Sequence, residues 1–238
     1  MDDLKIKERL ESLQSFKLHS EDSILRWKCN ISTEESMNIV KEIGRMFVSD
    51  FAIDDENAFV YMNLVRWVNG DDSMQALDPV SRNSIVKGNL KRGIYLAGTT
   101  GSGKTLCMEI IKAYASIVGA KIQVYPNGKK DMTWTPIHAT MIADIYTTQG
   151  YVGDIDGKDI LLIEDFGCEP EFVSFMGNKI DVLKRMIEYR CDFSNKITMI
   201  TTNLPLMNDL TKERYGNRVV SRLAELNYFE LRGKDRRL

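Results

Sequence analysis

The sequence predicts an α/β protein in which a parallel sheet is flanked by helices. From residue 93 onward, short apolar runs typical of buried strands alternate with helical patterns. The first of these runs ends in a glycine-rich loop that continues directly into a helix. Earlier residues show helical periodicity instead. We therefore expect a small helical N-terminal domain at residues 1–85, which would bind a partner, followed by an α/β domain at residues 86–238.

The N-terminal region is expected to contain three helices. Residues 4–13 repeat apolar side chains at helical spacing. Ser32 and Glu35 form a capping box that begins a second helix. Residues 55–70 carry an apolar face and end in a glycine, which suits a helix terminus. Residues 70–89 are polar and rich in turn residues, so we expect them to be a linker between the two regions.

The α/β domain is expected to begin with a strand and to keep alternating. Asn127 and Gly128 lie between two β-like runs, which is a strong hairpin signal. We expect no C-terminal lid domain, because little chain follows the last strand. The expected elements are, in order, a strand at 93–98, a helix at 102–118, the hairpin, a helix at 140–150, a strand at 158–167, a helix at 178–193, a strand at 196–203, a helix at 213–226 and a strand at 228–233.

Composition narrows the class of protein. The net charge of −2 does not indicate a wholly basic nucleic-acid binder. No apolar run approaches the ~20 residues that a membrane span requires, so we expect no membrane partner. The four cysteines are scattered without a C-x-x-C pair, which favours free thiols and a cytoplasmic location. The two histidines, His19 and His138, form no recognised metal spacing with them, and we expect both to be structural.

A phosphate-binding loop is the strongest motif in the sequence. Residues 98–105 fit the pattern G-x-x-x-x-G-K-[ST] at every fixed position, with a strand before them and a helix after them. The glycines let backbone N–H groups turn toward phosphate oxygens, Lys104 can reach the β- and γ-phosphates, and the Thr105 hydroxyl can bind Mg²⁺. The nucleotide-binding residues that we predict are Gly98, Thr99, Thr100, Gly101, Ser102, Gly103, Lys104, Thr105 and Leu106.

Two later apolar runs are each followed directly by polar side chains: two acids after the first run and an amide after the second. Glu164 and Asp165 follow the run Leu161–Ile163, where one acid can hold Mg²⁺ and the other can polarise the attacking water. We assign the metal to Glu164 and the water to Asp165. Asn203 ends another buried-type strand and could orient that water; the alternative is an ordinary strand-end turn.

Arg218 and Arg222 lie four residues apart on one helix and therefore share a face. Such a pair is usually a solvated surface. It also suits an arginine finger, which reaches the γ-phosphate held by a neighbouring subunit. We count both arginines as candidate catalytic residues on that basis.

These motifs together resemble a known family. The segments "GIYLAGTTGSGKT", "LLIEDFG", "TTN" and "YGNRVVSRL" occur in the order and spacing of AAA+ ATPases of the DnaC-type helicase-loader group, which also includes the ATP-binding helper proteins of insertion-sequence transposons. The resemblance covers roughly residues 90–238. It implies a P-loop NTPase with a RecA-like sheet, ATP and Mg²⁺ as cofactors, and ATP-dependent homo-oligomers on single-stranded DNA.

The resemblance also assigns roles to single residues. By position, Lys104 and Thr105 are Walker A, Glu164 and Asp165 are Walker B, Asn203 is sensor 1, Arg222 is the arginine finger, Arg218 is a second arginine of the same box and Arg237 is a sensor-2-like arginine. The first Walker B acid is usually Asp in this family. Glu164 keeps the charge but is longer by one methylene, so we expect a shifted metal geometry and slow hydrolysis.

Three functions follow from these features, in decreasing order of support. The first is an ATPase that loads or remodels a replication protein, or serves a transposase, through the N-terminal helices. The second is a nucleotide-dependent scaffold with negligible hydrolysis. The third is a P-loop kinase, for which the chain lacks a clear arginine-rich lid. Tyr146 and Tyr151 could stack on the bases of single-stranded DNA, although tyrosines on a helix are more often packed.

Overall fold

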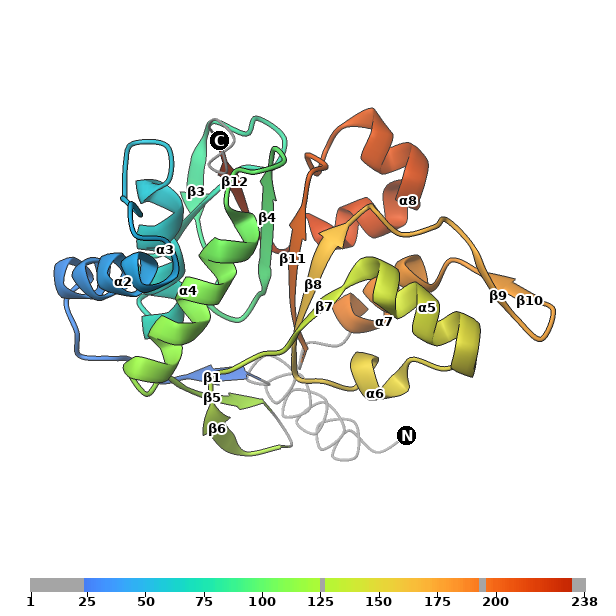
Figure 1. Ribbon diagram of the computed structural model, residues 1–238, viewed down its shortest axis with the longest axis horizontal. Coiled ribbons are helices and arrows are strands. Elements are labelled where there is room, and N and C mark those ends of the chain that lie inside the picture. Colours follow the sequence, from blue (N-terminus) through green and yellow to red (C-terminus); the bar gives the residue numbers. More distant parts are fainter. Residues whose placement is uncertain (1–23, 125–126, 193–195, 233–238) are drawn as a thin grey trace, which may run out of the picture.

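The computed structural model describes residues 24–124, 127–192 and 196–232 (Figure 1). The helix expected at residues 4–13 lies outside these ranges, as does Arg237. Within the described ranges, no helix is both long enough and apolar enough to cross a membrane.

The central sheet confirms the predicted α/β class. It has seven strands in the order β3-β2-β12-β4-β11-β8-β7. The five strands from β12 to β7 run parallel, and β2 and β3 extend the sheet antiparallel at one end. In that order, the strands are Ile85–Lys87, Gln75–Leu77, Asn227–Leu231, Ile94–Gly98, Ile197–Thr202, Ile160–Phe166 and Pro136–His138.

Helices cover both faces of this sheet (Figure 1). Ile94 and Leu96 of β4 belong to one apolar core, whereas Tyr95 and Ala97 belong to another, because successive strand residues point to opposite faces. A strand that is buried on both faces has apolar residues at nearly every position, which explains the continuous apolar run at residues 93–98. The first core is covered by α2 (Thr33–Phe47), α3 (Ala58–Asn69) and α4 (Lys104–Ile117); the second is covered by α5 (Ala139–Gln149), α6 (Gly153–Asp156), α7 (Val182–Asp192) and α8 (Asp209–Leu223).

Two helix ends in the N-terminal region follow the predicted signals. The Ser32 Oγ accepts a hydrogen bond from the Glu35 backbone N–H at 3.1 Å, which caps α2. Gly70 ends α3 with φ of 66°, a left-handed conformation that favours glycine. Both boundaries could therefore be predicted from local sequence alone.

The first 85 residues do not form a separate core in their described part. Buried side chains of α2 and α3 pack with those of α4 and β4 in one cluster. The Tyr114 hydroxyl of α4 hydrogen-bonds to Ser36 of α2 at 2.7 Å and to Asn69 of α3 at 2.9 Å. The expected linker at 70–89 is wrong, because it contains β2 and β3, which join the central sheet. A partner-binding role for residues 1–85 stays a prediction.

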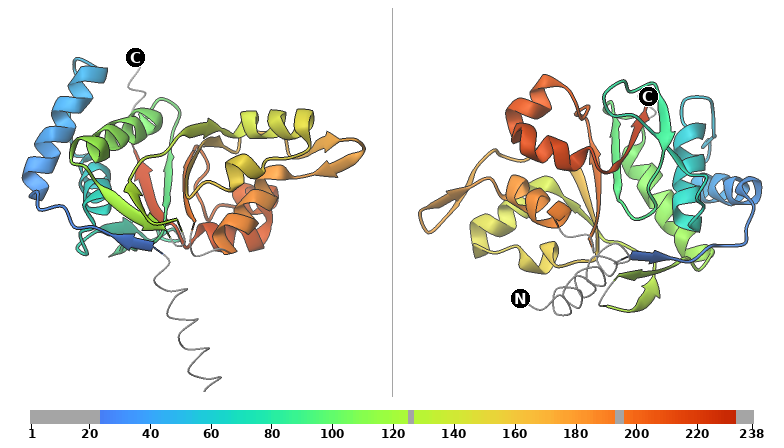
Figure 2. Two further views of the ribbon diagram at one scale, coloured as in Figure 1. Left: turned by 90° about the horizontal axis from the view of Figure 1, so that it is seen from below. Right: turned by 180° about the vertical axis from the view of Figure 1, so that it is seen from behind.

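Two hairpins accompany the main sheet. The hairpin predicted at Asn127 and Gly128 is confirmed: β5 (Lys121–Val124) pairs antiparallel with β6 (Lys129–Asp131), and β1 (Ile24–Arg26) joins β5. The second hairpin, β9 (Val173–Phe175) with β10 (Asn178–Ile180), projects from the body beside α5 (Figure 2). The helix expected from residue 178 is therefore wrong at its start, since α7 begins at Val182.

Candidate nucleotide-binding site

The loop between β4 and α4 has the backbone that a phosphate cradle requires. Gly101 and Gly103 adopt φ of 78° and 88°, and Gly103 is the N-cap of α4. A Cβ atom at Gly98 would lie 2.6 Å from both the Ser102 Oγ and the Leu231 carbonyl oxygen, so only glycine fits there. Among the described residues, the buried Ser102 Oγ has no hydrogen-bond partner, which suits a donor to phosphate.

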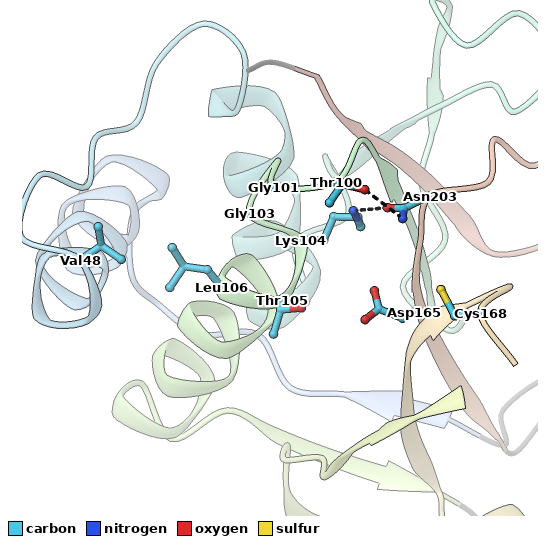
Figure 3. A pocket seen from close by; sticks show the side chains of 10 residues that line it. All are labelled: Val48, Thr100, Gly101, Gly103, Lys104, Thr105, Leu106, Asp165, Cys168 and Asn203. Carbon is cyan, nitrogen blue, oxygen red and sulfur yellow. Dashed lines mark hydrogen bonds between the residues drawn. The ribbon is translucent and has the colours of Figure 1, made fainter. Parts of the chain in front are cut away.

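Lys104 and Asn203 meet although they are far apart in the sequence. The Lys104 side chain is largely buried, and its Nζ donates to the carbonyl oxygens of Gly98 and Thr99 at 3.0 and 2.9 Å. It also donates to the Asn203 Oδ1 at 2.7 Å (Figure 3). The Asn203 Nδ2 in turn donates to the Thr100 Oγ1 at 3.4 Å. The end of β11 therefore positions the lysine charge.

The two acids at the end of β8 differ in their surroundings. Burial raises the pKa of the Glu164 carboxyl, and the negative charges of Asp165 and Glu109 raise it further. His138 and the nearby Thr105 hydroxyl act in the opposite direction. The two residues that we predicted to bind the metal therefore lie near each other.

Asp165 is held in place by groups from two neighbouring strands. Its φ of 50° is unusual for a residue other than glycine. Its Oδ2 lies 2.7 Å from the Nε2 of His138 at the end of β7, and its backbone N–H donates to the Thr201 Oγ1 of β11 at 3.3 Å. The other ring nitrogen of His138, Nδ1, lies 3.0 Å from the Thr140 Oγ1. The geometry therefore fixes both the carboxylate and the imidazole.

From the sequence we predicted only a structural role for His138 and no role for Thr201. His138 reaches the acids because β7 pairs in register with β8, with His138 opposite Glu164. Nothing in the local sequence signals this pairing. Only the strand order brings the histidine to the site.

The phosphate-binding loop, Asp165 and Asn203 border one cavity of about 400 Å³, a volume within the usual range of small-molecule sites. It is lined by Val48, Thr100, Gly101, Gly103, Lys104, Thr105, Leu106, Asp165, Cys168 and Asn203 (Figure 3). Val48 and Cys168 were not expected from the sequence. Val48 follows α2, so the N-terminal helices contribute directly to the cavity wall.

The oxygen donors at this site suit Mg²⁺. A group of three or more His, Cys, Asp or Glu side chains that could hold a metal is absent from the described ranges. Mg²⁺ does not need such a group, because it is usually bound by one or two protein oxygens together with phosphates and water. The Thr105 hydroxyl and the Glu164 carboxylate fit that mode.

The candidate arginines lie away from the cavity of their own chain. The Arg222 Nε donates to the Asp192 Oδ1 of α7 at 2.8 Å, and the Arg222 side chain is only 21% exposed. The Arg218 Nε lies 3.6 Å from the Glu188 Oε1, and the Arg218 side chain is 67% exposed. Neither arginine lines the cavity, so their role in a neighbouring site stays a prediction.

The two tyrosines considered for DNA contact line a second cavity, of about 410 Å³, between α5, α6 and α7. Tyr151 is 62% exposed, whereas the Tyr146 ring packs edge-on against Phe175 of β9. Their contact with single-stranded DNA remains untested.

The described residues have the fold of P-loop AAA+ proteins, and the first cavity lies at the glycine-rich loop of that fold. No family model and no curated protein matches the chain. Among solved structures, that of DnaI is 18% identical, covering 82% of this chain and 93% of that chain with a TM-score of 0.50. A candidate primosome component from Streptococcus pyogenes serotype M3 is 16% identical, covering 82% and 95% with a TM-score of 0.50. At these identities the likeness shows the fold, and it confirms the fold expected from the helicase-loader resemblance.

Proposed function

We propose that this chain binds ATP with Mg²⁺, hydrolyses it, and uses the cycle to load or remodel a DNA replication protein on single-stranded DNA. One observation carries the proposal: Lys104, Thr105, Asn203 and Asp165 line the same cavity. The AAA+ fold, shared with DnaI and with a candidate primosome component, supports a setting in replication.

Each part of the cavity has a distinct task in this proposal. The N-terminus of α4 and Lys104 bind the phosphates. When bound through Thr105 and Glu164, Mg²⁺ would neutralise phosphate charge. Asp165, oriented by His138, would accept a proton from the attacking water, and Asn203 would orient that water.

The arginines of α8 fit a role between subunits. Because Arg218 and Arg222 do not line the cavity of their own chain, they could act only on the site of a neighbour. Arg222 would first have to exchange its ion pair with Asp192 for the phosphate. We therefore propose an ATP-dependent homo-oligomer in which Arg222 is the finger and Arg218 assists it.

The test is ATP turnover by the purified chain, with and without single-stranded DNA. We expect slow turnover that DNA stimulates, and none with Lys104→Ala. Arg222→Ala is expected to keep ATP binding but to lose the stimulated rate. Normal turnover per subunit in Arg222→Ala would contradict the role in a neighbouring site. Co-purification through residues 1–85 would then identify the partner: a replicative helicase supports loading, whereas a transposase supports transposition.

A nucleotide-dependent scaffold is the second candidate, and Glu164 favours it. Its raised pKa reflects a carboxylate that is buried next to two other acids, which is a poor environment for keeping the full charge on a metal ligand. Single-turnover hydrolysis separates the two candidates. A rate no faster than background, both with and without DNA, would support assembly without hydrolysis.

A further inference from the structure

A buried carboxylate joins the turn after β8 to α8. The Glu169 side chain is fully buried. Its Oε2 accepts a hydrogen bond from the Gly167 backbone N–H at 2.8 Å, within the turn itself. Its Oε1 accepts from the Arg214 guanidinium at 3.0 Å and from the Tyr215 hydroxyl at 2.5 Å, both on α8. One side chain thus binds both segments at once.

Other contacts fix the first part of α8 in the same place. The Tyr215 ring stacks on Phe166, the last residue of β8, with centroids 4.3 Å apart. The Arg214 guanidinium also donates to the Asp181 Oδ2 at 2.6 Å, and the Asp181 Oδ1 accepts from the Lys184 N–H at the start of α7. These contacts therefore fix the first part of α8 to the end of β8 and to the start of α7.

The arginines come after a break in the same helix. Gly216 has φ of 79° and ψ of 158°, which divides α8 into two parts. Among the described residues, a Cβ at Gly216 would meet only the Lys184 Nζ, at 3.6 Å, so the positive φ rather than crowding favours glycine there. Arg218 and Arg222 lie beyond the break and are ion-paired with Glu188 and Asp192 of α7.

The turn itself borders the nucleotide cavity. Asp165 and Cys168 line the cavity, and the Cys168 backbone N–H donates to the Asp165 carbonyl oxygen at 3.0 Å. Glu169 follows immediately. A shift of this turn would therefore be passed through Glu169 to Arg214 and Tyr215, which lie just before the break.

We infer that Glu169 is a positioning residue that ties the Arg218–Arg222 segment to the turn beside Asp165. Through it, the nucleotide cavity of one subunit sets how far its arginines reach into the next subunit. The inference rests on the proposed function, because it requires those arginines to complete a neighbouring site.

Mixed oligomers test it. Asp165→Asn subunits keep a nucleotide cavity and their arginines but lack the catalytic acid, whereas Arg222→Ala subunits keep the acid but lack the finger. Each is expected to be inactive alone, and their mixture is expected to recover hydrolysis at the Arg222→Ala sites. Glu169→Gln is then added to one type of subunit at a time.

In the Asp165→Asn subunit, which supplies the arginine, Glu169→Gln is expected to lower the recovered rate on the order of 100-fold, the loss typical of a misplacement of about 1 Å. In the Arg222→Ala subunit, the same change is expected to leave the recovered rate close to that of the unmodified mixture. Glu213→Gln, an exposed change on the same helix, is the matched control and is expected to have no effect in either subunit.

Three results would overturn the inference. Equal losses in both subunits would show that Glu169 acts only on its own site. An unchanged rate in both would show that it positions nothing. No recovery in the unmodified mixture would refute the proposed role of the arginines in a neighbouring site, and with it this inference. If circular dichroism shows that Glu169→Gln is unfolded, Tyr215→Phe in the arginine-supplying subunit decides: a lowered recovered rate supports the inference, and an unchanged rate refutes it.

Discussion

Replacing His138 by alanine is expected to slow ATP hydrolysis with little change in ATP binding. The His138 Nε2 lies 2.7 Å from the Asp165 Oδ2, and the Thr140 hydroxyl holds the other ring nitrogen. An ionised carboxylate only accepts hydrogen bonds, so Nε2–H donates to Asp165, while Nδ1 contacts the Thr140 hydroxyl. Because His138 does not line the cavity, its loss acts on the nucleotide through Asp165.

The size of the effect follows from the exposure of this pair. A hydrogen bond to a charged group contributes about 1.5–3 kcal/mol where water is excluded. The His138 and Asp165 side chains are 42% and 40% exposed, so solvent screening reduces the contribution to about 1 kcal/mol. That corresponds to roughly fivefold in rate. If Asp165 also moves by about 1 Å, the loss approaches 100-fold.

Single-turnover hydrolysis measures this loss, and a fluorescent nucleotide titration measures binding separately. His138→Asn keeps an amide donor and is expected to recover part of the rate. Thr140→Val removes only the outer contact of the ring and is expected to have a smaller effect than His138→Ala. If His138→Ala hydrolyses ATP at the normal rate while Asp165→Asn is inactive, the idea that His138 positions the catalytic acid is refuted.

Three further predictions concern other parts of the molecule. Asn203→Ala is expected to lower kcat by about 10- to 100-fold with little change in ATP affinity, because Asn203 is proposed to orient the attacking water, whereas the loop and Lys104 bind the phosphates. Equal losses in kcat and in affinity would argue against this role. The pKa of Glu164 is raised, so its carboxylate is expected to take up a proton at a higher pH than the 4.5 of an ordinary glutamate. Mg²⁺-dependent ATP binding, titrated at several pH values, is therefore expected to weaken as the pH falls through the raised pKa. Glu164→Gln is expected to abolish this pH dependence. Leu64 is buried in the core that α2 and α3 share with α4, so Leu64→Ala is expected to lower the free energy of unfolding by about 2–5 kcal/mol. A urea titration is expected to show a single unfolding transition. Two transitions would indicate an independent N-terminal domain.

The phosphate-binding loop could be predicted because its signal is local. The glycines at 98, 101 and 103 and the following helix are adjacent in sequence, and a backbone turn with positive φ requires them. Asn203 could be predicted for a different reason. Parallel strands present their carboxyl ends at one edge of the sheet, so a polar residue that ends a buried strand lies near the loop whatever the strand order.

The positions of His138 and Val48 could not be predicted, because they depend on strand order and helix packing rather than on neighbouring residues in the sequence. His138 reaches Asp165 only because β7 is the neighbour of β8, a fact of strand order. Val48 reaches the cavity because α2 packs on α4. Strands β2 and β3 were missed because each has three residues and β3 is exposed at the sheet edge, so neither shows an apolar run.

The length of the Glu164 side chain bears on the proposed metal site and on the proposed hydrolysis. The resemblance predicts Asp at this position, and Asp would hold its carboxylate about 1.5 Å further back, the length of one C–C bond. The shorter side chain would then reach less far toward the metal ion that it is proposed to share with Thr105. Glu164→Asp is therefore expected to weaken Mg²⁺-dependent ATP binding by up to about tenfold without accelerating turnover. ATP affinity measured with Mg²⁺ and with a chelator isolates the metal-dependent part. Faster turnover of Glu164→Asp at saturating ATP would show instead that the longer side chain restrains hydrolysis, and would favour the scaffold.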